Sequence, residues 1–152
     1  MNSSNIVAEV GLTYKTTVPV DGMQRITSPD AAYELLKSLF DKDTIQLQEQ
    51  FIIVLLDPNK RCLGYTTISK GGATSTIVDP KFIFQTALLA NSDGILLAHN
   101  HPSSNSELKA STADINLTKR LDKSAKLLGM QIVDHIILSS TGYLSMKNKG
   151  LL

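Results

Sequence analysis

Two histidines separated by one residue, His99 and His101, are the side chains that most clearly indicate chemistry in this sequence. They follow the short apolar run 94–98, which is bounded by turn-forming residues and by Pro102 and is typical of a buried strand. Side chains alternate between the faces of a strand, so both imidazoles are expected on one side of a sheet. Such a pair can share a metal ion, although histidines on strands are more often hydrogen-bonded structural residues.

The pattern Ser111-x-x-Asp114 follows and has two interpretations. A hydroxyl with an acid three residues later, just before an apolar helical pattern, has the form of a helix capping box. The helical wheel instead places Asp114 at the start of an apolar stripe that continues with Leu117, Leu121, Ala125 and Leu128. A capping acid is expected to face solvent, whereas an acid on this stripe would face the sheet and could reach the two imidazoles. Two nitrogens and one oxygen would then leave one position of a tetrahedral zinc open for water, as in catalytic sites.

A zinc-activated water needs a base, and Glu49 is the candidate because it lies at the start of the other strongly apolar strand, predicted over 48–56, where partial burial would make its carboxylate a stronger base. Taken alone, Glu49 is more simply an exposed acid at a strand edge. His135 is expected to be a satisfied core histidine or one that supports a ligand, and Cys62 to be a packing residue. The third predicted helix carries a basic cluster that favours a solvated face over a phosphate-binding patch: Lys119, Arg120, Lys123 and Lys126.

Composition leaves the substrate open. The 152 residues fit one domain with a proper core, and a formal net charge of +1 gives no global field that would favour nucleic acid or a membrane surface. A single cysteine excludes an internal disulfide and a multi-cysteine zinc site. The sequence has no secretory pattern at its start and no apolar run long enough to span a bilayer, so we expect a soluble, cytoplasmic protein with no membrane partner.

The pattern along the chain alternates helices with strands and predicts an α/β layered domain. Cap and proline signals predict helices over 29–40 and from 80 to about 90, and a third helix is predicted from about 112 to 128. Apolar runs predict strands over 48–56, 62–69, 94–101, 131–138 and 143–145. A weak alternation predicts an edge strand over 6–14, and residues 17–24 are predicted to form a loop.

These residues together resemble the RadC-type branch of the JAB/MPN (JAMM) metalloprotein family. The resemblance rests on an upstream glutamate, H-x-H-P and S-x-x-D, here Glu49, His99-Asn100-His101-Pro102 and Ser111-x-x-Asp114, supported by Asp134-His135-Ile136-Ile137. It spans residues 26–152, with residues 1–25 as an N-terminal strand and loop that is part of the domain or appended to it. The implied fold is a mixed sheet flanked by helices in a cytidine-deaminase-like three-layer arrangement.

The resemblance implies a role for each residue of the motif. His99, His101 and Asp114 would hold Zn²⁺, Glu49 would position and deprotonate the zinc-bound water, and Ser111 would stabilise the tetrahedral intermediate or orient the site. The target implied is an amide or isopeptide-like bond. DNA or DNA-repair proteins are implied as partners by the family name alone.

The chain departs from the usual RadC pattern between the two halves of the motif. Ser104 replaces a glycine, Ala110 replaces a proline, and the 103–110 spacer is two residues longer, so the direction of Asp114 depends on this loop. Glu107, within the spacer, is a candidate substitute ligand, although an acid in a loop is most often solvated. The helix-hairpin-helix segment that often precedes this domain in longer relatives does not occur in these residues.

Two functions from different classes follow. The first is a zinc-dependent hydrolase of the JAMM type. The second is a non-catalytic binding module associated with DNA repair or replication, in which the metal site is structural or vestigial. A nucleobase deaminase is excluded, because that chemistry requires H-x-E and P-C-x-x-C and the chain has one cysteine.

Overall fold

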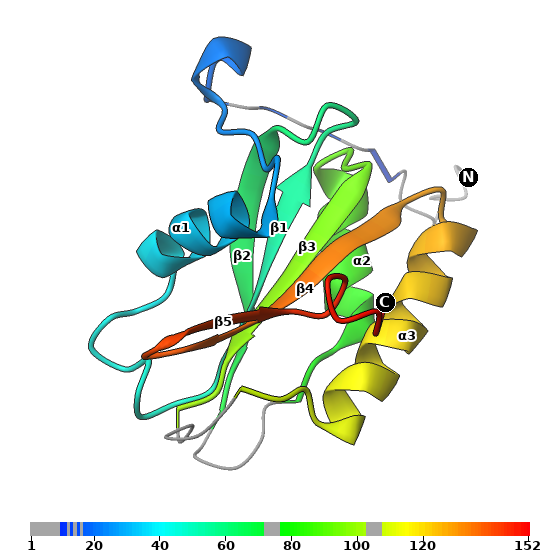
Figure 1. Cartoon of the computed structure of the whole chain (residues 1–152). Helices are drawn as coiled ribbons and strands as arrows, with labels where there is room; N and C mark the ends of the chain where they lie inside the picture. The colour runs from blue at the N-terminus through cyan, green and yellow to red at the C-terminus, as the bar shows by residue number, and fades with distance from the viewer. Residues whose placement is uncertain (1–9, 12, 14, 16, 72–76, 103–107) are drawn as a thin grey trace, which may run out of the picture.

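The computed structural model describes residues 10, 11, 13, 15, 17–71, 77–102 and 108–152. Within these ranges the chain forms a mixed five-stranded sheet with helices on both faces (Figure 1), consistent with a JAB/MPN fold as the sequence predicted. In chain order the elements are η1 (Val20–Gly22), α1 (Pro29–Leu39), β1 (Gln50–Leu56), β2 (Cys62–Lys70), α2 (Pro80–Leu89), β3 (Gly94–Asn100), α3 (Thr112–Leu127), β4 (Gln131–Ser139) and β5 (Gly142–Ser145).

The helices begin where the sequence predicts them because each first turn is capped by a side chain. Ser28 Oγ accepts a hydrogen bond from Ala31 N at 3.1 Å in α1, and Asp79 Oδ1 accepts one from Lys81 N at 2.9 Å in α2. A proline follows each of these caps and fits the first helical turn. At the other end of α3 the chain turns at Gly129, whose φ of 73° favours glycine.

The sheet order is β2-β1-β3-β4-β5. Strand β1 runs antiparallel to both β2 and β3, while β3 and β4 are parallel and β5 returns antiparallel to β4. Two adjacent parallel strands need a long crossover, and α3 supplies it. Strands β1 and β3 are buried along their whole length, which explains why their sequences are continuously apolar.

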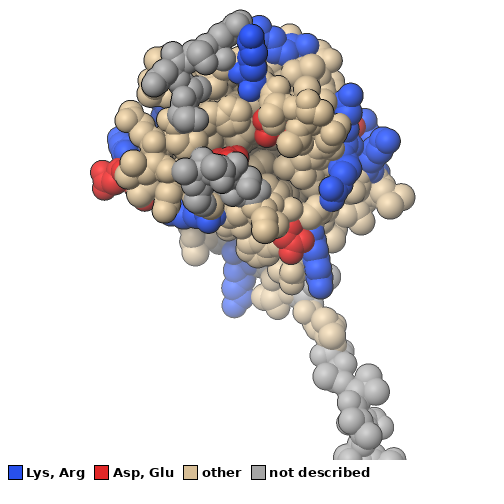
Figure 2. Space-filling model, turned by 90° about the horizontal axis from the view of Figure 1, so that it is seen from below, with Lys and Arg blue, Asp and Glu red and all other residues tan. Residues whose placement is uncertain are grey.

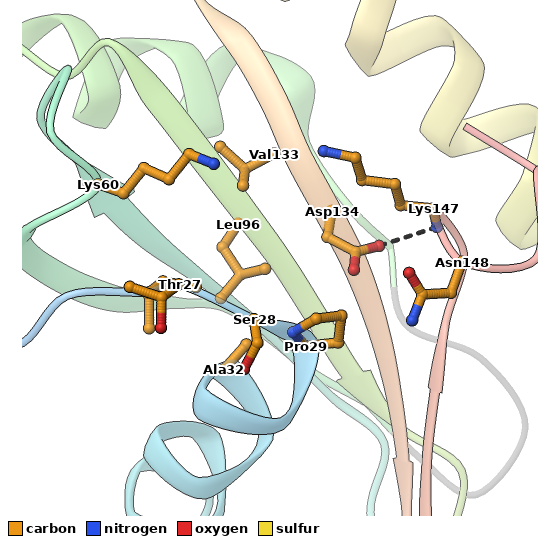
Figure 3. A pocket seen from close by; sticks show the side chains of 11 residues that line it. Thr27, Ser28, Pro29, Ala32, Lys60, Leu96, Val133, Asp134, Lys147 and Asn148 are labelled. Carbon is orange, nitrogen blue, oxygen red and sulfur yellow. Dashed lines mark hydrogen bonds between the residues drawn. The ribbon is translucent and has the colours of Figure 1, made fainter.

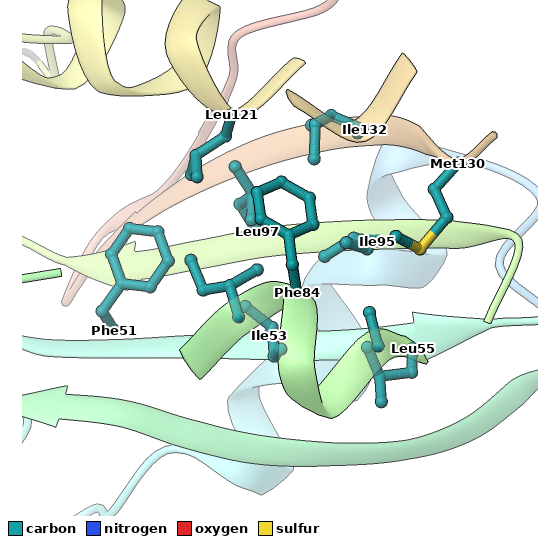
Figure 4. Close-up of a cluster of buried hydrophobic side chains, with 12 residues drawn as sticks. Phe51, Ile53, Leu55, Phe84, Ile95, Leu97, Leu121, Met130 and Ile132 are labelled. Atoms are coloured by element: carbon teal, nitrogen blue, oxygen red, sulfur yellow. The ribbon is translucent and has the colours of Figure 1, made fainter. Parts of the chain in front are cut away.

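Apolar clusters fill the space on the two faces of the sheet. Helices α2 and α3 cover the face whose cluster is shown in Figure 4, and its buried members are Phe51, Ile53, Leu55, Ile83, Phe84, Ala87, Ile95, Leu97, Leu121, Ala125, Met130 and Ile132. Helix α1 covers the opposite face, with buried members Ile26, Ala32, Leu36, Phe40, Ile52, Val54, Leu56, Leu96, Ala98, Ile136 and Leu138. The alternation of these two sets along β1 and β3 determines which residues can reach the face of α3.

The structure differs from the sequence prediction at two places. Of the edge strand predicted over 6–14, the described residues Val10, Gly11 and Thr13 have no regular secondary structure, and the others lie outside the described residues. Leu128 was predicted on the core-facing stripe but is 43% exposed, because α3 ends at Leu127 and Leu128 is its C-cap. Among the described residues, no helix has the length and apolar character needed to cross a membrane.

Candidate metal centre

Strand β3 carries both predicted histidines to its C-terminal end, on the face covered by α2 and α3. His99 is buried, with its side chain 1% exposed, while His101, just past the strand, is 26% exposed. Their Nε2 atoms are 2.9 Å apart. The Phe51 ring from β1 lies parallel to His99, with centroids 5.9 Å apart and planes 7° from parallel. The two imidazoles therefore converge at the edge of an apolar core that fixes the inner one.

Asp114 lies at the N-terminus of α3, where it combines the two roles that the sequence presented as alternatives. Its carboxylate closes a capping box: Oδ2 accepts hydrogen bonds from Ser111 N at 2.8 Å and Ser111 Oγ at 2.7 Å, and Ser111 Oγ accepts from Asp114 N at 3.1 Å. The same carboxylate is only 14% exposed, and its Oδ1 lies 3.2 Å from His99 Nε2. The expectation that a capping acid faces solvent is wrong here, because Oδ2 caps the helix while Oδ1 points at His99.

The spacer before α3 does not prevent this approach. Asp114 Oδ2 also lies 3.6 Å from His101 Nε2, so the carboxylate faces both rings despite the two additional residues. Glu107, the candidate substitute ligand, lies outside the described residues.

The three side chains fit a tetrahedral zinc ion. Their ligand atoms all lie within 4.8 Å of one another, and no other such cluster occurs among the residues that the structure describes. Zn–N and Zn–O bonds are about 2.0–2.1 Å long, so neighbouring ligands of a tetrahedral ion lie about 3.3 Å apart. The observed contacts of 2.9, 3.2 and 3.6 Å lie around that value. Small shifts would bring all three donors onto one ion and leave a fourth position open.

The surroundings keep Asp114 ionised, as a metal ligand must be. Burial alone would raise the pKa of this carboxyl, but hydrogen bonds to His101 and His99, the charge of His99 and the hydrogen bond from Ser111 outweigh burial and hold the pKa well below its ordinary value. Because this carboxylate is already desolvated and oriented, little additional free energy is needed to desolvate or orient it when a cation binds.

Glu49, the predicted base, stands one residue before β1 and is half-buried. The β1–β3 register pairs Phe51 with His99. The pairing ends there, because the next backbone N–H of β1, that of Gln50, donates to the Asn100 side chain instead. Glu49 therefore follows the same alternation as Phe51, two residues earlier, and its role as the base stays a prediction.

Asn100, the residue between the two histidines, points to the opposite face and holds the chain around Glu49. Its Nδ2 donates to the carbonyl oxygens of Ile45 at 2.6 Å and Gln48 at 2.9 Å, and its Oδ1 accepts from Gln50 N at 2.7 Å. Asn100 is completely buried. The segment that carries Glu49 is thus fastened directly to the histidine-bearing strand, a role that sequence reasoning missed.

Comparison with known proteins places this chain in a family. Residues 26–151 match the family model described as RadC-like JAB domain. The chain belongs to the RadC-like JAB family. Proteins named UPF0758 are its relatives in Finegoldia magna (46% identical over 103 residues), Aquifex aeolicus (36% over 127) and Clostridium beijerinckii (32% over 146). These matches cover 68%, 84% and 96% of this chain but 45%, 52% and 62% of the relatives, so the chain spans about half their length.

The third histidine of this RadC-like JAB domain, His135 on β4, contacts the candidate metal centre. Its Nε2 lies 2.8 Å from His99 Nδ1, and its Nδ1 lies 2.6 Å from Thr118 Oγ1 of α3. His135 is fully buried, and burial, followed by repulsion from His99, lowers its pKa well below the ordinary histidine value. His135 comes beside His99 because β4 pairs parallel to β3, with Leu97 opposite His135.

Asp134, the neighbour of His135, points to the other face of the sheet and is structural. It accepts hydrogen bonds from Ser145 Oγ at 2.5 Å, His135 N at 2.7 Å and Lys147 N at 3.0 Å. Figure 3 shows Asp134 beside a pocket of about 130 Å³ near the start of α1. A buried acid with this many partners fastens the C-terminal segment to β4.

The remaining candidates behave as the sequence predicted. Lys126 forms an exposed ion pair with Asp122 at 2.6 Å, and the other basic residues of the cluster on α3 are exposed. Cys62 is half-buried, and burial, with a smaller contribution from the charge of Asp57, raises its pKa to about 11. A thiol of this kind is a packing residue and a poor nucleophile.

Proposed function

We propose that this RadC-like JAB domain is a zinc-dependent hydrolase that cleaves an amide or related carbonyl bond. The convergence of His99, His101 and Asp114 on one point carries the proposal, because this donor set leaves a coordination position open. When held by these donors, zinc would supply Lewis acidity and lower the pKa of a coordinated water to about 7.

Side chains of this chain would orient the ligands and transfer the protons. Asp114 is held by Ser111 at one oxygen and faces the ion site with the other. Glu49, half-buried two residues before Phe51, the β1 partner of His99, would take the proton of the attacking water and return it to the leaving group. The Ser111 hydroxyl already donates to Asp114 Oδ2, which supports a role in orienting that ligand over direct stabilisation of the tetrahedral intermediate.

The exposed side of the site indicates how a substrate would approach. His99 is buried and Asp114 nearly so, whereas His101 keeps 26% of its side-chain surface exposed. A carbonyl group would therefore enter beside His101, the candidate ligand that remains most open to solvent. A peptide or isopeptide bond is the substrate class that this arrangement and the family resemblance favour.

A DNA-binding module with a structural or vestigial metal site has less support. Figure 2 looks onto the end of the molecule toward which β3 ends, and there acidic side chains lie near the middle of the view and most basic ones toward its rim. Phosphate backbones are bound by clustered Lys and Arg, and the whole chain carries a net charge of only +1. DNA affinity with a steep salt dependence, unchanged by Glu49→Gln, would favour this alternative.

Metal content tests the proposal first. The full chain purified under zinc-replete conditions should contain about one zinc by elemental analysis, since the described residues hold one three-ligand cluster. The double variant His99→Ala/His101→Ala should lose it. Folded wild-type protein without zinc under these conditions would contradict the proposal.

Catalysis is tested separately from metal binding. Glu49→Gln should keep its zinc but hydrolyse a library of peptide and isopeptide substrates about 10²–10⁴-fold more slowly, because it removes the base alone. Asp43→Asn is the matched control, since Asp43 is an exposed acid in the loop before β1. If Glu49→Gln and wild type turn over a cleaved substrate equally well, Glu49 is not the base.

A further inference from the structure

A row of buried polar groups connects α3 to the inner histidine of the candidate metal centre. Thr118 Oγ1 lies 2.7 Å from the carbonyl oxygen of Asp114 and 2.6 Å from His135 Nδ1. His135 Nε2 lies in turn 2.8 Å from His99 Nδ1. Thr118 and His135 are completely buried, so each group in the row depends on its protein neighbours for hydrogen bonds.

The chemistry of the groups gives the row a direction. The Thr118 hydroxyl has a single proton, and the Asp114 carbonyl at 2.7 Å can only accept it, whereas His135 Nδ1 at 2.6 Å can accept or donate. When the proton goes to the carbonyl, the Thr118 oxygen accepts from His135 Nδ1–H. A neutral imidazole with its proton on Nδ1 presents a lone pair at Nε2, and this lone pair accepts from His99 Nδ1–H. In the zinc-loaded protein His99 is then left with its own lone pair at Nε2, the atom that lies 3.2 Å from Asp114 Oδ1 in the structure.

We propose that Thr118 and His135 are positioning residues that set the tautomer of His99, so that its Nε2 lone pair faces the ion in the zinc site proposed above. The inference rests on that proposed function and adds the reason why the buried ligand is ready to bind. Metal-ligating histidines commonly donate their second N–H to a fixed acceptor, which orients the ring and raises its basicity.

The opposite proton arrangement shows what the row prevents. If the Thr118 hydroxyl donated to His135 Nδ1, His135 would donate from Nε2 to His99 Nδ1, and His99 would carry its proton at Nε2. That proton would point at Asp114 Oδ1, 3.2 Å away, and occupy the place of the ion. The Asp114 carbonyl would also lose the Thr118 hydrogen bond. A second acceptor near the hydroxyl, Met146 Sδ at 3.5 Å, is too weak to compete with a carbonyl.

The substitution Thr118→Val tests this inference because it keeps the shape of the side chain and removes the hydroxyl. His135 Nδ1–H would lose its acceptor, so the His135 tautomer with a lone pair at Nδ1 would become the lower in free energy of the two. The zinc affinity of the full chain, measured by competition with a chromogenic chelator, should fall about 10–100-fold. Thr118→Ser, which retains the hydroxyl, is the matched control and should stay within about threefold of wild type.

A spectroscopic measurement on the wild type does not depend on how well a variant folds. The chain has three histidines, so ¹⁵N-histidine labelling gives three imidazoles to assign. The zinc-loaded protein should carry protons on Nδ1 of both His99 and His135. An Nε2 proton on His135 would overturn the inference, as would wild-type zinc affinity in Thr118→Val. Either of these two results would leave the proposed function intact. Wild-type protein that binds no zinc would instead overturn the proposed function together with the inference.

Discussion

Asp114→Asn separates the two roles of the carboxylate at the start of α3. An asparagine oxygen can still accept from Ser111 N and Oγ, now at 2.8 and 2.7 Å, so the capping box survives. Its other terminal atom, which faces His99, becomes an NH₂ group that cannot bind a cation. Two hydrogen bonds to a charged acceptor become bonds to a neutral one, at about 0.5–1 kcal/mol each. The metal-free variant should be less stable by about 1–2 kcal/mol, or about 2–8 °C in Tm for a chain of this size.

Zinc should distinguish wild type and variant far more strongly. At a free zinc concentration about 100 times the wild-type Kd, binding adds about 2.7 kcal/mol, which raises Tm by about 5–11 °C. Outer-sphere partners alone contribute about 10–100-fold to metal affinity, so losing a direct ligand should weaken binding at least about 100-fold. The gain at the same zinc concentration then falls to about 0.4 kcal/mol, or about 1–2 °C.

Differential scanning calorimetry with and without zinc measures both quantities. Asp122→Asn is the control on the same helix, because Asp122 pairs with Lys126 far from the histidines, and it should keep the full zinc effect. Asp114→Ala removes the cap as well and should lower the metal-free Tm further than Asp114→Asn does. A full zinc-induced rise in Asp114→Asn would refute the assignment of Asp114 as a ligand.

Two further predictions concern residues outside the ligand set. Asn100→Leu leaves two carbonyl groups and one N–H without their buried partner and should lower the free energy of unfolding, measured in urea, by about 2–5 kcal/mol. Asn100→Asp keeps the acceptor but not the donors, so it should not restore the lost stability. A loss below about 1 kcal/mol in Asn100→Leu would contradict the role given to Asn100. Cys62, with its pKa raised from 9.0 to about 11, should have about 90-fold less thiolate at pH 8 than an unperturbed thiol, partly offset by the greater nucleophilicity of that thiolate. Alkylation of Cys62 by iodoacetamide at pH 8 should be about 10–20-fold slower in the folded chain than in the urea-unfolded chain, and it should accelerate as pH rises toward 11. Equal rates in the two states at pH 8 would contradict the assignment of a raised pKa to the buried thiol.

The sequence predicted the elements well where a local signal determined them. Ser28 and Asp79, each followed by proline, define helix starts through hydrogen bonds within the first turn, and these bonds form as predicted. The continuous apolar runs of β1 and β3 predicted buried strands because both faces of the sheet are covered by helices. The N-terminal prediction over 6–14 rested on weak alternation alone and is not confirmed by the residues described there.

The site was harder to predict because its contacts are not local. The sequence offered Asp114 as either a cap or a ligand, but a carboxylate has two oxygens, and the geometry uses them differently. His135 comes beside His99 only through the parallel register of β3 and β4, which a sequence pattern does not specify. No sequence pattern indicated a role for Asn100, because its hydrogen-bond partners lie in the distant 44–50 segment.

The crossover from β3 through α3 to β4 implies that metal binding and catalysis have separate origins in the chain. One β-α-β unit, residues 94–139, supplies all three candidate donors and both groups that orient His99. The proposed base comes from elsewhere, at the start of β1, and Asn100 joins the two parts. A descendant of this chain could therefore lose turnover through changes in the 44–50 segment while it still held its ion, and could recover turnover without rebuilding the ion site.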